Sequence, residues 1–139
     1  MKYVLDTNVV SGLMKGDPRV LDNLRRASRR DVAVPQPALA EIAYGISRLP
    51  RSRRRDRLAQ RYRLIREELV RAPWTDEVSQ RYGEIKAALE RRGDRIEDFD
   101  AAIAAHALAA EAALVTADRH LLRIPGLTVV DWGRAAGEE

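Results

Sequence analysis

Residues 1–8, MKYVLDTN, place a short apolar run directly before an aspartate. The run, residues 3–5, contains an aromatic and a β-branched side chain, which is typical of a buried strand. Ligands bind at the carboxyl ends of strands in open α/β sheets, so we expect Asp6 where chemistry is usually found. A second interpretation stays open on this stretch alone: Asp6 or Asn8 caps the helix that follows.

The size and composition favour a globular protein. The chain has 139 residues, of which 45% are hydrophobic and 33% charged, so we expect residues 1–139 to form a single domain. Cysteine is absent, which excludes disulfides, thiolate metal sites and cysteine nucleophiles. No apolar run approaches the ~18 residues that a membrane span needs, and no secretory signal is evident. We therefore expect a cytoplasmic protein with no membrane partner.

The positive charge of the chain is carried almost wholly by arginine. The formal net charge is +4, and the densest basic run lies at residues 51–57, with a second at 25–30. Arginine binds phosphate with two parallel hydrogen bonds and stacks on bases, so such a surface is compatible with nucleic acid. Arginine-favouring codon usage gives the same bias, and both interpretations stay open.

Short apolar runs alternate with amphipathic segments along the chain. Strands are predicted at 3–5, 32–34, 114–116 and 128–130. Helices are predicted at 9–15, from 18 onward, at 37–49, over two long amphipathic segments around 58–69 and 76–89, and at 99–111 after a cap at Asp98. The alternation predicts an α/β fold, a short parallel β-sheet flanked by helices. The two long segments predict a helical hairpin, and the alanine-rich last helix is expected to be central.

Four acids recur at positions where parallel strands or helix starts bring side chains to one edge of a sheet. Asp6 and Asp118 each follow an apolar strand, whereas Glu41 and Asp100 lie in the first turns of helices. Like charges gathered together need a cation, and oxygen ligands favour Mg²⁺ or Mn²⁺. Each acid also has a simpler explanation, because a carboxylate near a helix N-terminus is stabilised by ~0.3–1 kcal/mol without metal.

The whole pattern resembles a PIN-domain ribonuclease, and specifically the VapC toxins of bacterial toxin–antitoxin pairs. The resemblance rests on motifs in this order: VLDTN (4–8), LAEIAYG (39–45), DAAIAA (100–105), LVTAD (114–118), PGL (125–127) and DW (131–132). It implies a PIN-like fold and a catalytic metal site made of Asp6, Glu41, Asp100 and Asp118. Thr7 and Thr116 are the implied polar supports of that site.

The resemblance also implies an activity and partners. The implied activity is cleavage of RNA phosphodiester bonds by an endoribonuclease that uses one or two Mg²⁺ or Mn²⁺ ions. The implied partners are the RNA substrate, a cognate VapB-type antitoxin and a second copy of the chain in a homodimer. The protein would then act as the toxin of the pair.

Two other functions remain open from the sequence. The first is a non-catalytic RNA-binding domain, although aromatic residues, at 5%, are sparse for base stacking. The second is a phosphotransfer enzyme that becomes phosphorylated on Asp6. Such an enzyme needs a lysine near the strand ends, and the only lysines are Lys2, Lys15 and Lys86, none of which follows a later strand.

Overall fold

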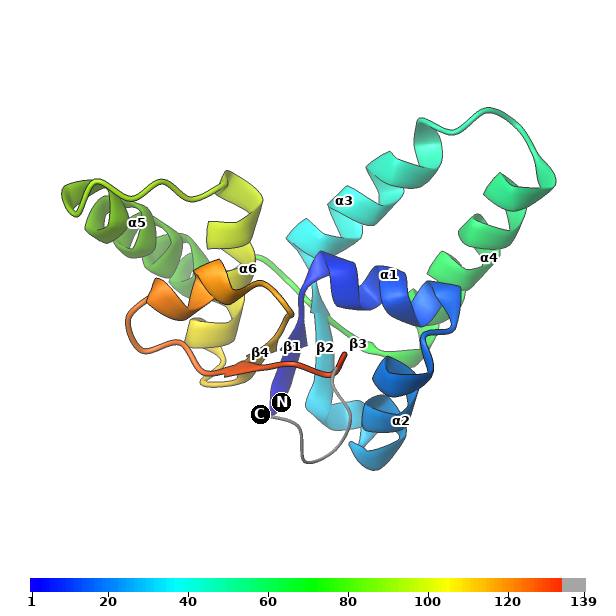
Figure 1. Ribbon diagram of the computed structural model, residues 1–139, viewed down its shortest axis with the longest axis horizontal. Coiled ribbons are helices and arrows are strands. Elements are labelled where there is room, and N and C mark those ends of the chain that lie inside the picture. The colour runs from blue at the N-terminus through cyan, green and yellow to red at the C-terminus, as the bar shows by residue number, and fades with distance from the viewer. Residues whose placement is uncertain (134–139) are drawn as a thin grey trace.

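The first strand, β1 (Tyr3–Leu5), lies in the middle of a parallel sheet (Figure 1). The computed structural model describes residues 1–133. The strand order is β3-β2-β1-β4-β5, and every neighbouring pair is parallel. The other strands are β2 (Val32–Pro35), β3 (Val70–Ala72), β4 (Ala113–Val115) and β5 (Val129–Val130). The predicted short parallel sheet flanked by helices is thereby confirmed.

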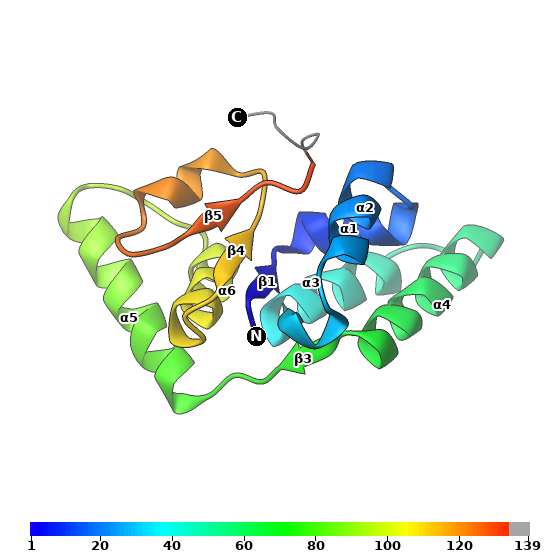
Figure 2. The ribbon, with the colours of Figure 1, turned by 90° about the horizontal axis from the view of Figure 1, so that it is seen from below.

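The helices gather in two groups. They are α1 (Thr7–Lys15), α2 (Pro18–Arg26), α3 (Gln36–Ser47), α4 (Arg53–Glu68), α5 (Asp76–Arg91) and α6 (Asp98–Ala109), with short 3₁₀ helices η1 (Arg29–Asp31) and η2 (Arg119–Arg123). Figures 1 and 2 both show α5 and α6 on one side of the molecule and α1 to α4 on the other. Within residues 1–133, no helix is long and apolar enough to cross a membrane.

Helix α6 is the central helix of the fold, as its alanine content predicts. Every residue from 101 to 107 is buried, and the helix contacts α5, α3, β1 and β4. Such burial on all sides requires small side chains, since neighbouring elements approach the helix axis closely. This packing fixes the N-terminal turn of α6 near the carboxyl ends of β1 and β4.

Strand β3 was not predicted, and it changes which helices pair. It forms the edge of the sheet beside β2, with Val70 opposite Ala33, and it separates the two long helices predicted as a hairpin. Helix α4 packs against α1 and α3 instead, and the Tyr62 hydroxyl donates to the Leu39 carbonyl at 3.1 Å. Helical hairpins are present, but α3 pairs with α4 and α5 with α6 (Figure 1).

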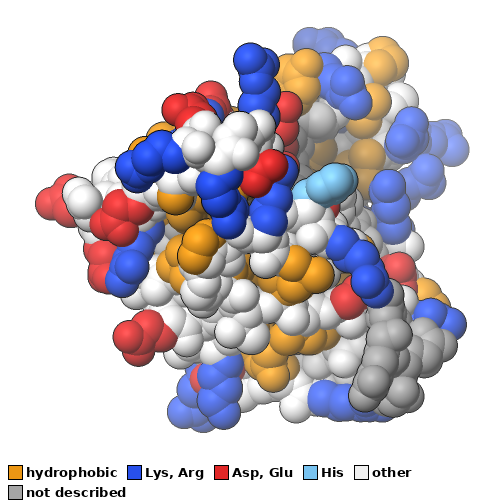
Figure 3. All heavy atoms as spheres, turned by 60° about the vertical axis from the view of Figure 1, so that its left-hand side comes forward, with side chains coloured by type: hydrophobic (Ala, Val, Ile, Leu, Met, Phe, Trp, Pro, Cys, Tyr) orange, Lys and Arg blue, Asp and Glu red, His pale blue; other side chains and the backbone are white. Residues whose placement is uncertain are grey.

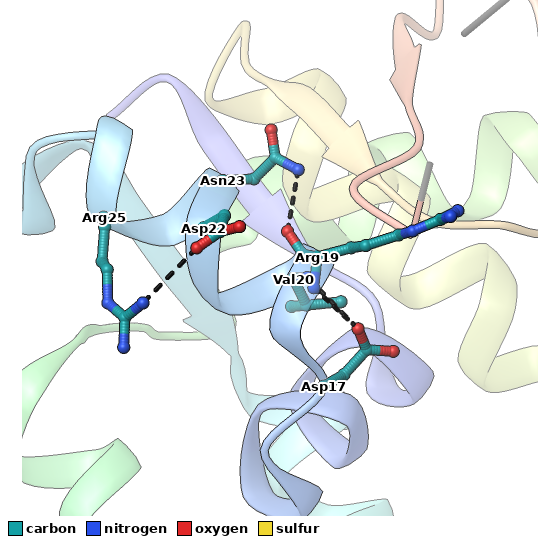
Figure 4. Close-up of polar contacts among 6 residues, drawn as sticks. All are labelled: Asp17, Arg19, Val20, Asp22, Asn23 and Arg25. Atoms are coloured by element: carbon teal, nitrogen blue, oxygen red, sulfur yellow. Dashed lines mark hydrogen bonds and ion pairs between the residues drawn. The ribbon is translucent and has the colours of Figure 1, made fainter. Parts of the chain in front are cut away.

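Helix α2, whose cap and internal bonds are drawn in Figure 4, contacts the segment that follows β5. The helix is capped as its Asp-Pro start predicts, because Asp17 Oδ1 accepts from the backbone N–H groups of Arg19, at 3.0 Å, and Val20, at 3.4 Å. The Asn23 amide donates to the carbonyls of Arg19, at 2.9 Å, and Trp132, at 3.1 Å. The bond from Asn23 to Trp132 therefore joins α2 to the segment that follows β5. The last six residues of the predicted domain, 134–139, lie outside the described residues.

Candidate active site

Asp6 lies at the carboxyl end of the central strand, where the sheet register places it beside β4. Leu5 is opposite Val115, so the next residues along, Asp6 and Thr116, are neighbours. The Thr116 hydroxyl donates to Asp6 Oδ2 at 2.7 Å, and both side chains are buried. Thr116, predicted as a polar support, is therefore in direct contact with a predicted ligand.

Asp6 is also the N-cap of α1. Its Oδ1 accepts from the Thr7 backbone N–H at 2.8 Å, so the capping geometry that the sequence left open is present. The alternative cap, Asn8, is exposed and lies inside the helix, which begins at Thr7. The Asp6 carboxylate thus has two contacts: one oxygen caps α1 at Thr7, and the other accepts from Thr116 at the edge of the sheet.

Glu41 reaches the same edge from α3. This helix begins directly after β2, and Glu41 lies in its second turn with a half-buried side chain. The Thr7 hydroxyl donates to Glu41 Oε1 at 2.6 Å, which joins the start of α1 to α3. Thr7 therefore bears the same relation to Glu41 that Thr116 bears to Asp6.

Asp118 is held by the turn that follows β4. Its backbone N–H donates to the Thr116 hydroxyl at 3.0 Å, and its Oδ1 accepts from the His120 N–H at 2.9 Å. Asp118 is therefore the N-cap of η2, as its simpler interpretation predicts. Thr116 bonds to both Asp6 and the backbone of Asp118, which fixes these two acids relative to each other.

The pKa of Asp100 reflects both its burial and the acids around it. Its pKa is raised to about 6, first because burial desolvates the carboxylate. The further causes are the negative charges of neighbouring carboxylates, which are Asp6, Asp118, Glu41 and Glu97. The structure therefore brings the other three sequence-predicted acids close enough to Asp100 for their charges to act on its carboxylate.

Two residues just before Asp100 differ from expectation. Asp98 does not cap α6, because the helix already begins there; its carboxylate accepts from Lys86 Nζ at 2.5 Å, and this bond holds the pKa of Asp98 below its usual range. The charge of Glu97 also raises the pKa of Asp100, and the sequence analysis did not predict Glu97 as part of the acidic group. A spacing of three residues places it near Asp100 across one helical turn, and this was the signal that could have found it.

The donor chemistry of the acids fits a hard divalent cation. All four groups are carboxylates, the ligands that Mg²⁺ and Mn²⁺ prefer. The carboxylate of Asp100 makes no hydrogen bond among residues 1–133, so its oxygens remain available. As they stand, no three acidic or histidine side chains in the described part of the chain lie close enough together to hold one ion.

Besides a cleft of about 350 Å³ beside Thr116 and Asp118, two clefts adjoin the acids. The larger, about 700 Å³, is lined by Asp100 and Asp118 together with the cationic residues Lys86, Arg95 and Arg123. Figure 3 faces the α5–α6 side of the molecule, where Lys and Arg side chains lie intermixed with Asp and Glu. The smaller cleft, about 280 Å³, lies among α1, α3 and α4; its lining includes Thr7, Glu41, Met14, Ile42, Tyr44, Ile46 and Leu58.

The chain matches the model of a known family over most of its length. The model of the PIN domain matches residues 3–127. The chain therefore belongs to the PIN-domain family, and the resemblance inferred from the motifs is confirmed.

Its relatives include VapC nucleases. The chain is 30% identical over 137 residues to Ribonuclease VapC2 of Rickettsia felis, spanning 96% of this chain and 100% of that protein. It is 26% identical over 133 residues to the tRNA(fMet)-specific endonuclease VapC of Salmonella typhimurium, spanning 95% and 98%. The crystal structure of VapBC2 from Rickettsia felis bound to a promoter DNA fragment matches with a TM-score of 0.85 and 29% identity, over 95% of this chain and 99% of that one.

Proposed function

We propose that Asp6, Glu41, Asp100 and Asp118 hold Mg²⁺ or Mn²⁺ and that the chain is an endoribonuclease acting as the toxin of a toxin–antitoxin pair. The observation that carries this proposal is the convergence of the acids at one edge of the sheet: burial, and then the charges of Asp6, Asp118 and Glu41, raise the pKa of Asp100. Carboxylates crowded in this way oppose one another unless a cation joins them. The VapC relatives supply the reaction class, because both are named as ribonucleases or endonucleases.

The site residues would have different roles in phosphodiester hydrolysis. Mg²⁺ or Mn²⁺, when bound, supplies positive charge that offsets the scissile phosphate and lowers the pKa of water. The buried carboxylate of Asp6 is kept in place by the hydroxyl of Thr116, so its oxygens are oriented before any ligand arrives. The carboxylate of Asp100, which makes no hydrogen bond among residues 1–133, would be available to hold the ion beside Asp6.

The other two functions are less well supported. A domain that only binds RNA has no need of converging carboxylates, which repel the phosphate backbone. A phosphotransfer enzyme needs a lysine beside Asp6, yet Lys86, the only lysine lining the cleft of Asp100 and Asp118, donates to Asp98. The PIN-domain match also favours the nuclease over both alternatives.

A VapB-type antitoxin is proposed as the partner. The matched structure is a VapBC complex, and the smaller cleft among α1, α3 and α4 has the apolar lining that a protein partner requires. Tyr44 is 67% exposed there, one helical turn from Glu41. A partner seated on Tyr44 would cover Glu41 and block the site. A homodimer is proposed on the family resemblance alone.

The function is tested by metal-dependent cleavage of a panel of cellular RNAs. Wild-type protein is expected to cleave with Mn²⁺ or Mg²⁺ and not with EDTA, and Asp100→Asn to lose at least about a hundredfold in rate. The matched control is Asp22→Asn, which removes an exposed carboxylate of α2 that pairs with Arg25 (Figure 4). Cleavage by Asp100→Asn at the control rate would show that Asp100 is not part of the site.

A further inference from the structure

The cleft beside Asp100 and Asp118 contains cations that the acidic site itself does not use. Its lining, drawn from α5, the α5–α6 loop and η2, includes Lys86, Arg95 and Arg123. A cleft of about 700 Å³ that carries both charges beside a metal-binding site is suited to a phosphorylated ligand. The question is which of these cations is available to bind it.

Only one of the three has a side chain without a partner in the described part of the chain. Lys86 donates to Asp98 at 2.5 Å, and Arg123 pairs with Asp94 at 3.7 Å. The guanidinium of Arg95 has neither an ion pair nor a hydrogen bond among residues 1–133, and the residue is exposed. Arg95 is therefore the cation of this cleft that is available to a ligand.

The backbone that carries Arg95 is anchored although its side chain is not. The guanidinium of Arg123 donates to the Arg95 carbonyl, and the guanidinium of Arg92 donates to the Arg123 carbonyl at 2.9 Å. These reciprocal bonds fix the α5–α6 loop against η2, the turn that Asp118 caps. A ligand that binds Arg95 therefore meets a loop already in place, which lowers the entropic cost of binding.

We propose that Arg95 binds a backbone phosphate of the RNA strand next to the scissile phosphate and so guides the strand past Asp100 and Asp118. This inference rests on the proposed function. A guanidinium matches phosphate with two parallel hydrogen bonds, and its charge offsets the repulsion between the strand and the carboxylates. The same guanidinium also suits a carboxylate of an acidic peptide, so the test must separate the two ligands.

The test measures binding of a fluorescein-labelled single-stranded oligouridylate, with millimolar Ca²⁺ in place of Mg²⁺, over a series of KCl concentrations. Arg95→Ala is expected to weaken binding about tenfold at low salt and to reduce the salt slope by about 0.7, the share of one phosphate contact on a single strand. Arg95→Lys is expected to restore the slope, since it restores the charge. The matched control is Arg81→Ala, an exposed arginine of α5 that pairs with Glu77 and does not line the cleft.

Three results would overturn the inference. They are binding by Arg95→Ala equal to that of the Arg81→Ala control, absence of RNA binding by the wild type at low salt, and competition by poly-glutamate as strong as that by unlabelled RNA. The last result would assign the cleft to an acidic peptide. Failure of the proposed function looks different: the wild type would bind RNA through Arg95 yet cleave no RNA with any divalent metal.

Discussion

At the scale of single residues, the acids of this site differ in what else holds them. Asp6 and Asp118 each cap a helix and accept backbone hydrogen bonds, whereas Asp100 has no such bond among residues 1–133. Asp6→Asn would disturb the contacts with Thr7 and Thr116, so loss of activity would have two explanations. Asp100 is the better probe, because its substitution removes a charge and no hydrogen bond.

Asp100→Asn is expected to stabilise the metal-free protein above about pH 6. The folded-state pKa of Asp100 is about 6, above the ordinary 3.8, so the folded chain binds more protons between these values. The stabilising contribution of this group is thus complete below pH 3.8 and lost as the pH rises through about 6. The asparagine, which does not titrate, avoids this loss. Urea unfolding in EDTA at several pH values measures the difference, and a variant less stable than wild type at pH 8 would show that burial and the neighbouring charges do not destabilise the Asp100 carboxylate.

His106 is expected to make the protein sensitive to acid, independently of the site. It is buried against Trp74, with ring centroids 6.0 Å apart, and its Nε2 has no hydrogen-bond partner in the structure. Burial lowers its pKa from 6.5 to about 4, so the unfolded chain binds more protons between these values. The free energy of unfolding should therefore fall by up to about 3 kcal/mol as the pH falls through this window.

His106→Leu removes that titration and keeps a similar side-chain volume. Its free energy of unfolding, relative to wild type, should rise steadily as the pH is lowered from 6.5 to about 4. Urea unfolding at matched pH values provides the measurement. A constant difference between the two proteins over this range would show that His106 is not the acid-sensitive group.

The positions of the acids were predictable from the sequence to a large extent, while their contacts were not. An acid after an apolar strand gives Asp6 and Asp118, because parallel strands end at the same edge of the sheet. The hydroxyl bridges from Thr7 and Thr116 were indicated only by the family resemblance. Glu97 precedes Asp100 by three residues, a spacing that could have indicated it. Arg95 lies in a loop without periodicity, so no pattern indicated that it lines the cleft of Asp100.

At the scale of elements, α6 determines where the site forms, because it packs against both strands that carry acids. Ala104 is fully buried, as are its neighbours on every side of the helix. Helix α4 differs sharply, since it contains no fully buried residue and extends beside α3 away from the sheet (Figure 1). Packing tolerance should therefore differ between these two helices.

Ala104→Leu is expected to destabilise the protein by about 1–3 kcal/mol, because added methyl groups have no space in a closely packed core. The matched control is Ala59→Leu, which makes the same change at an exposed position of α4. Leucine and alanine have similar helix propensities, so the control should change stability by less than about 0.5 kcal/mol. Thermal unfolding compares the two, and equal effects would contradict the central packing of α6.

Strand β3 shows where reading the elements from sequence fails. Its three residues, Val70–Ala72, have an exposed arginine in the middle, and the strand lies at the edge of the sheet. A short edge strand has neither the apolar run of a buried strand nor enough length to show alternation. The sequence pattern therefore predicts that α4 and α5 pair, whereas the strand between them separates them into different helix groups.

At the scale of the whole molecule, the sheet order explains how acids far apart in sequence meet. Strand β1 lies between β2 and β4, so the segments that follow these three strands share one edge. Asp6, Glu41 and Asp118 lie in those segments. Asp100 lies near them in the first turn of α6, which packs against β1 and β4. The parallel topology thus converts separate motifs into one cluster of negative charge.

Calorimetric titration with Mn²⁺ tests most directly whether that cluster is one cation site. Wild-type protein and the Asp22→Asn control should bind Mn²⁺ with the same saturable isotherm, whereas Asp100→Asn should bind at least about tenfold more weakly because a charged oxygen ligand is lost. Absence of saturable binding by the wild type, or equal affinity in Asp100→Asn, would contradict a metal site built from Asp6, Glu41, Asp100 and Asp118.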